Sequence, residues 1–149
     1  VAITPSCGFV SPLGAIVVGI AAGVVCSFAI GWKFKAGYDD SLDVVGAHGV
    51  GGIMGALLTG VFATKAWGAP EDGLLAGNAF LLVKQLVGVL ATILYAGFGS
   101  FVVFKLVALV RPLRVPVRDE AEGLDVSQHG EEGYSDGEGA MLVLQDSAA

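Results

Sequence analysis

The chain has 149 residues, of which 54% are hydrophobic and 15% charged, and its formal net charge is −6. A soluble domain averages about 45–50% apolar and about 25% charged residues, so this composition excludes an ordinary soluble domain and favours a protein in lipid. Residues 1–110 carry five basic and five acidic residues, whereas residues 111–149 carry three arginines and nine acidic residues. We therefore expect a solvated tail, disordered after about residue 135, and no nucleic-acid binding.

Three stretches are apolar enough to cross a bilayer, which takes about 20 residues. They cover residues 13–32, 44–64 and 86–104, the third extended to 80–110. In lipid, only helices and closed barrels satisfy the hydrogen bonds of all backbone polar groups. The sequence therefore predicts an all-α, polytopic transmembrane helical bundle over residues 1–110 and a tail over 111–149.

The first ten residues are interpreted as the end of an earlier span followed by a turn with proline and glycine. The chain begins at Val1, already apolar, and shows no basic leader region. We therefore expect it to be a piece that begins inside a longer protein.

Basic residues gather at two ends of the apolar stretches. Lys33 and Lys35 follow the first stretch, and Lys105 and the three arginines follow the third, whereas loop 65–79 has one lysine against two acidic residues. Because basic loops stay on the cytoplasmic side, this pattern predicts that loop 33–43 and the C-terminus are cytoplasmic.

His48 is the single ionisable residue within the stretch 44–64. An ionisable residue inside a span is costly and indicates a functional interior position. A neutral imidazole has one donor and one acceptor nitrogen, so it can pass hydrogen bonds along a narrow path. The alternative is a structural histidine that bonds to a carbonyl group of a neighbouring helix.

Small residues surround His48. At α-helical spacing Val44, His48, Gly52, Gly55 and Thr59 share one face of the helix. Glycines let helices pack closely, and beside a histidine they also leave room for a narrow lumen. We expect Val44, His48 and Gly52 to line such a lumen and most other glycines only to pack helices.

Three acidic residues, Asp39, Asp40 and Asp43, lie just before this helix, and Asp40 is a candidate for its N-cap. A carboxylate at a helix N-terminus caps free N–H groups and is favoured by the helix dipole. The alternative is an acidic vestibule that attracts cations. The sequence shows no nucleophile–base pair, phosphate loop or metal-ligand cluster, so we expect no enzyme activity, cofactor or metal.

Three segments resemble one family. The run DDSLDVVGAHGVGGIMGALLTGVFA at residues 39–63 closely resembles the tenth transmembrane helix of the Amt/Mep ammonium transporters. Residues 2–26 resemble their eighth-to-ninth helix region, and residues 114–134 resemble their cytoplasmic C-terminal region. The chain departs from the family at Gly133, where alanine is usual. Three segments in the family's order argue against a chance match.

The resemblance implies a homotrimer of eleven-helix protomers in the plasma or inner membrane, each with a narrow hydrophobic pore. This chain is similar to the last three transmembrane helices and the tail. His48 falls on the second of two pore histidines, near which ammonium is deprotonated, and Val44 falls on an apolar pore-lining position. Asp40 and Asp43 fall on acidic positions at the cytoplasmic mouth.

The tail of the family is implicated in coupling between protomers and in contact with PII-type signal proteins. The positions that match this region are Gly123, Leu124, Asp125, His129, Gly130, Glu131 and Tyr134.

Ammonium or ammonia transport through a pore that contains His48 is the predicted function. One alternative is a membrane ammonium sensor that has the same fold and signals through its cytoplasmic tail. Another is a structural membrane subunit whose spans only pack against other helices.

Overall fold

The computed structural model describes residues 1–131, which contain helices, turns and loops but no strand, and the all-α prediction is confirmed. Three helical segments are long and apolar enough to cross a membrane: Pro12–Ala36 (α1), Val45–Phe62 and Ala79–Ala108 (α3). The chain forms two compact units that divide between Gly97 and Phe98, within α3. Tyr134 and the predicted disorder after residue 135 lie outside the described residues.

Helix α1 begins and ends with residues suited to those positions. Ser11 accepts a hydrogen bond from Gly14 N at 3.1 Å, and Pro12 occupies the first turn. Gly37 ends the helix at φ +66°, and its N–H donates to Lys33 O at 2.9 Å. The predicted start of the loop at residue 33 is therefore wrong, because α1 continues to Ala36 and the loop covers residues 37–43.

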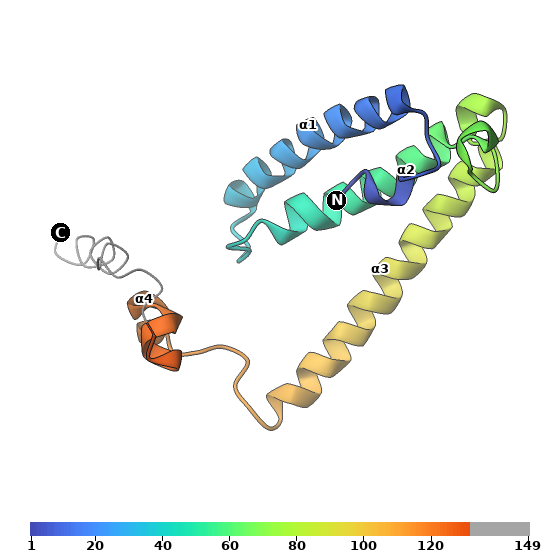
Figure 1. The fold of residues 1–149 in the computed structure, drawn as a ribbon. Coiled ribbons are helices and arrows are strands. Elements are labelled where there is room, and N and C mark those ends of the chain that lie inside the picture. Colours follow the sequence, from blue (N-terminus) through green and yellow to red (C-terminus); the bar gives the residue numbers. More distant parts are fainter. Residues whose placement is uncertain (132–149) are drawn as a thin grey trace. The chain divides into compact units, whose positions relative to one another are not determined.

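The second apolar segment contains two kinds of helix. Residues Val45–Val50 form a π-helix (η2), which continues into the α-helix Gly51–Phe62 (α2). It lies antiparallel beside α1 (Figure 1), since Gly46 meets Ile30 at one end and Phe62 lies near Gly14 at the other. A Cβ atom on Gly46 would lie 2.7 Å from Ile30 Cγ1, so only glycine allows this approach.

Residues 1–10 contain the predicted turn, and whether they follow an earlier span stays a prediction. They form turns around a short 3-10 helix at Thr4–Ser6 (η1), with a proline in its first turn. This segment packs on α2, where the buried residues Ser6 and Thr59 share a hydrogen bond of 2.7 Å. The small apolar core beside it contains Ala2, Val18 and Ala22, with Leu58 and Phe62 packed against them.

The predicted loop at 65–79 contains two short 3-10 helices, Lys65–Trp67 (η3) and Leu74–Ala76 (η4). Gly73 N donates to Ala63 O at 2.7 Å, and a Cβ atom on Gly73 would lie 2.8 Å from Gly60 O. The loop therefore folds back onto the C-terminal end of α2. Glu71 accepts a hydrogen bond from Lys84 at 2.5 Å, which lowers the pKa of the Glu71 carboxyl below its ordinary value.

Helix α3 begins after Asn78, whose side chain accepts from Phe80 N at 3.1 Å. It ends at Ala108, two residues before the predicted limit of residue 110, because Leu109 and Val110 form a turn ahead of Pro112. The tail then contains a short α-helix, Val117–Glu122 (α4), and a π-helical turn, Asp125–His129 (η5).

Candidate functional site

His48 lies in the π-helix at the start of the second apolar segment. Its side chain is exposed, and within residues 1–131 the imidazole makes no hydrogen bond or ion pair. The alternative of a ring bonded to a helix carbonyl is therefore not seen in the described part of the chain. Short π-helical segments inside α-helices occur frequently at functional sites.

Asp40 caps this helix with both oxygens of its carboxylate. Oδ1 accepts from Val44 N and Oδ2 accepts from Val45 N, each at 2.8 Å. These two N–H groups have no partner inside the helix, so the capping stabilises the turns that carry His48. Asp43 instead forms an ion pair with Lys33, a residue near the end of α1.

The stripe predicted from α-helical spacing is divided between two surroundings. Gly55 and Thr59 are buried against η1, and a Cβ atom on Gly55 would overlap the backbone of Ala2. A Cβ atom on Gly52 would meet nothing within 4 Å, and Gly52 lies instead beside a groove toward α3. Gly52 and Gly55 both lie in the regular α-helix α2, so they differ in the neighbours that they meet, Ala2 for Gly55 and the groove for Gly52.

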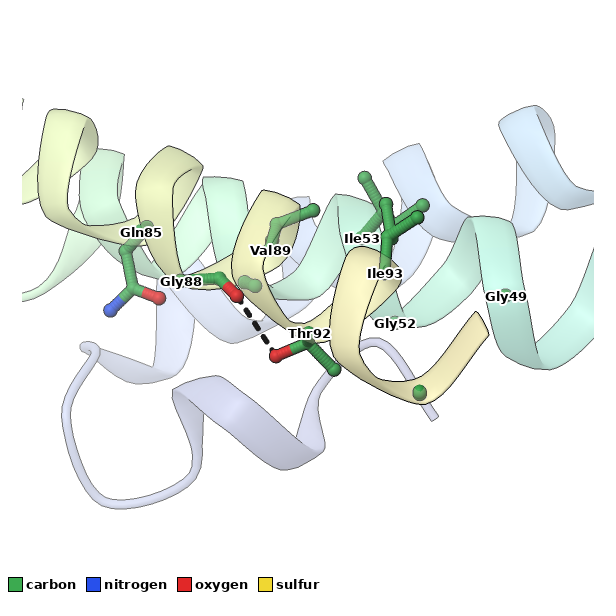
Figure 2. Close-up of a pocket in the computed structure, with 10 residues that line it drawn as sticks. Gly49, Gly52, Ile53, Gln85, Gly88, Val89, Thr92 and Ile93 are labelled. Atoms are coloured by element: carbon green, nitrogen blue, oxygen red, sulfur yellow. Dashed lines mark hydrogen bonds between the residues drawn. The ribbon is translucent and has the colours of Figure 1, made fainter. Parts of the chain in front are cut away.

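The groove between α2 and α3 has a volume of about 560 Å³ and is mainly apolar. Figure 2 shows small and branched apolar side chains along it, with Gln85 at one end and the Thr92 hydroxyl bonded to Gly88 O at 2.8 Å. Val44 and His48 are not among its lining residues. The lining consists of Gly49, Gly52, Ile53, Ala56, Gln85, Gly88, Val89, Thr92, Ile93 and Ala96.

The tail residues near its two glycines form one folded turn. Gly123 has φ +97° and Gly130 has φ +67°, conformations that suit glycine. Glu131 N donates to Asp125 O at 3.0 Å, which closes the turn that contains His129. Leu124 is exposed, and Tyr134 lies outside the described residues.

Polar contacts hold this turn to α4. The Ser127 hydroxyl donates to Gly123 O at 2.8 Å, and Gln128 donates to the Asp119 carboxylate at 2.7 Å. Arg114 binds both oxygens of Glu120 at 2.8 and 2.9 Å, which lowers the pKa of the Glu120 carboxyl. The tail therefore presents a compact helical motif just after the last long helix.

Two features of the site were missed from the sequence. The π-helix has no signal in the spacing of apolar residues, although the run of glycines between residues 46 and 55 marks an unusual helix. The contact of Lys33 with Asp40 and Asp43 was also missed, because the lysine was assigned only to the positive charge near the membrane surface. Among residues 1–131, no group of three or more His, Cys, Asp or Glu is placed to hold a metal ion.

Comparison with known proteins gives one consistent family. A family model described as Ammonium Transporter Family matches residues 1–134. An ammonium transporter of Bacillus subtilis is 46% identical over 138 residues, which cover 91% of this chain and 34% of that protein. An ammonium transporter of Aquifex aeolicus is 48% identical over 136 residues, which cover 91% of this chain and 32% of that protein. An ammonium transporter of Mycobacterium bovis is 42% identical over 146 residues, which cover 90% of this chain and 30% of that protein.

The chain thus spans about a third of the length of the curated relatives it matches. Its three long apolar helices agree with a place in a membrane transport protein. On the match over residues 1–134, this chain belongs to the ammonium transporter family.

Proposed function

We propose that the longer protein to which this chain belongs conducts ammonium or ammonia across the membrane, and that Val44, His48 and Gly52 face its pathway. The observation that carries the proposal is His48 itself. It lies in an apolar membrane helix, its ring is exposed, and within residues 1–131 it has no partner. An intramembrane histidine of this kind is expected to contact a substrate or water rather than lipid.

The surroundings of His48 suit a narrow pathway for a small polar molecule. A Cβ atom on Gly49 or Gly52 would meet nothing within 4 Å, so the space beside these residues is open. A neutral imidazole offers one donor and one acceptor nitrogen, which match the hydrogen-bonding groups of ammonia and water. The apolar residues around it favour the neutral form of the substrate over the hydrated ion.

The acidic residues on the loop side have a second role in this proposal. Asp40 already caps the helix, and Asp43 already pairs with Lys33, so both are held in fixed positions. Their carboxylates lie just before the His48 helix, where we place the cytoplasmic mouth of the pore. Loop 37–43 and the C-terminus are cytoplasmic in this arrangement, because basic residues follow the first and third spans.

Replacing His48 with alanine in the full-length protein is expected to lower uptake or to change its selectivity. The measurement is uptake of ammonium or methylammonium by transporter-deficient cells that express the parent or the variant at equal membrane levels. Val45→Ala is the matched control, because Val45 is exposed in the same π-helix and is not assigned to the pathway. Parental uptake with no effect of His48→Ala would favour a structural role. No uptake by the parent would favour the sensor.

The assembly and the tail belong to the proposal as well. We place this chain at the C-terminal end of its protein, in a homotrimer of the plasma or inner membrane, with a PII-type signal protein as a partner of the tail. The folded turn from Gly123 to Glu131 supports the partner of the tail, because it presents the exposed residues Leu124 and His129 on a defined backbone.

Deleting residues 123–134 from the full-length protein is expected to weaken transport, PII-protein binding or both. The reason is that the deletion removes the turn built on Gly123 and Gly130, while α4 and the long helices are kept. Uptake and co-purification with the PII protein are the two measurements. Normal values of both would show that this segment has no regulatory role.

A further inference from the structure

Lys33 connects α1 to the loop before the His48 helix. Its ammonium group forms an ion pair with the Asp43 carboxylate and donates to Asp40 O at 2.8 Å. The Lys33 side chain is 11% exposed, whereas Lys35 in the same turn of α1 is exposed. Lys33 is thus a largely enclosed cation with two defined acceptors, unlike a lysine that only extends into water.

Both residues that Lys33 contacts control the start of the π-helix. Asp40 caps it through Val44 N and Val45 N, and the carbonyl of Asp43 accepts from Ala47 N at 2.8 Å. Asp43 has φ +55°, a left-handed conformation that is uncommon for non-glycine residues and that aspartate and asparagine adopt more often than most. Such a conformation persists when the surroundings hold it in place, and the Lys33 ion pair supplies that hold.

A second contact fixes the same turn against α1. Gly46 is buried on Ile30, which precedes Lys33 by three residues and so lies on the same side of α1. The π-helix is therefore held at two neighbouring points, by apolar contact at Gly46 and by charge at Asp43. His48 lies two residues after Gly46, so the direction in which the His48 side chain leaves the helix depends on both contacts.

We propose that Lys33 is a positioning residue that sets the orientation of His48 through Asp40 and Asp43. The positioning role of Lys33 concerns only the loop and the π-helix. The consequence of this role for transport rests on the proposed function. A compact ammonium fits two acceptors of different kinds, one carboxylate and one carbonyl. Replacing it with methionine keeps most of the stem length but leaves the Asp43 carboxylate without its partner.

The first test reads the position of residue 48 without reference to transport. A cysteine is introduced at position 48 in a full-length background that has no other cysteine, and its labelling rate with a thiol reagent is measured. Lys33→Met is expected to change this rate about tenfold, the effect of losing a hydrogen-bonded charge. Lys35→Met should leave the rate unchanged. Asp43→Asn should change it as Lys33→Met does, since asparagine tolerates the positive φ but removes the charge.

An unchanged labelling rate in Lys33→Met would overturn the proposal, even if the variant is less abundant in the membrane, because Lys33 would then only stabilise the fold. The second test measures uptake both in proteins that keep His48 and in the His48→Ala background. Lys33→Met should lower uptake when His48 is kept. When His48→Ala is already present, adding Lys33→Met should cause no further loss of uptake. A changed labelling rate with normal uptake would keep the positioning role and count against the proposed function instead.

Discussion

Replacing Gly55 with alanine is expected to lower the free energy of unfolding of the full-length protein by about 2–3 kcal/mol. The new methyl group would overlap the carbonyl carbon and oxygen of Ala2, which are backbone atoms that no rotamer change can move. Gly55 is buried, so the methyl group has no other direction in which to relax. The first residues of the chain would be pushed away from α2.

The control for Gly55→Ala is Gly52→Ala, three residues earlier on the same helix. A Cβ atom on Gly52 meets nothing within 4 Å in the described chain, and alanine is a better helix former than glycine by about 1 kcal/mol. Thermal unfolding in detergent should therefore separate the two variants clearly. Equal melting temperatures would show that the segment before α1 does not pack on α2 as the structure has it.

The close contact at Gly55 also bears on the site. The same helix carries His48 two turns earlier, and it contacts Ile30 of α1 at Gly46 and Ala2 at Gly55. A helix held at two points by glycine contacts has little freedom to rotate. This is the property that the proposed pathway beside His48 would require, because a rotation of the helix would turn the imidazole away from it.

The long helices could be predicted because their cause is local. An uncharged stretch of about 20 residues and a serine–proline start are visible in the sequence, and α1 has both, whereas its end at Ala36 lies four residues beyond the predicted limit of residue 32. Helix α3 likewise ends just ahead of Pro112, as expected from the clash of proline with a preceding helix. These features depend on residues within a few positions of one another.

The π-helix and the Lys33 contact could not be predicted, because their causes are distant in the sequence. The π-helix packs on α1 where Gly46 meets Ile30, 16 positions earlier, and a spacing analysis at 3.6 residues per turn contains no information on this contact. Lys33 lies ten residues before Asp43, and its charge alone indicates the membrane surface rather than a partner. The predicted stripe from Val44 to Thr59 is divided because Gly55 meets Ala2 and Gly52 lies beside the groove toward α3, both of which are distant in the sequence.

The buried pair of Ser6 and Thr59 gives the second strong prediction. The Thr59 hydroxyl donates its proton to Gly55 O at 2.8 Å, so it accepts from the Ser6 hydroxyl at 2.7 Å. Ser6 is 0% exposed. Thr59→Val keeps the shape of the side chain but leaves the Ser6 donor buried without a partner, which costs about 1–3 kcal/mol.

The double variant distinguishes a lost hydrogen bond from a lost contact. Ser6→Ala alone should cost about 1 kcal/mol or less, since Thr59 keeps its bond to Gly55 and hydrogen bonds in membrane proteins average about 0.6 kcal/mol. Adding Ser6→Ala to Thr59→Val removes the unpaired donor, so the double variant should unfold at a higher temperature than Thr59→Val. If the two losses simply add in full-length protein, the hydroxyls act independently and the pair does not hold η1 on α2. Recovery in the double variant would instead show that this polar contact is part of how the first residues bind the helix that carries His48.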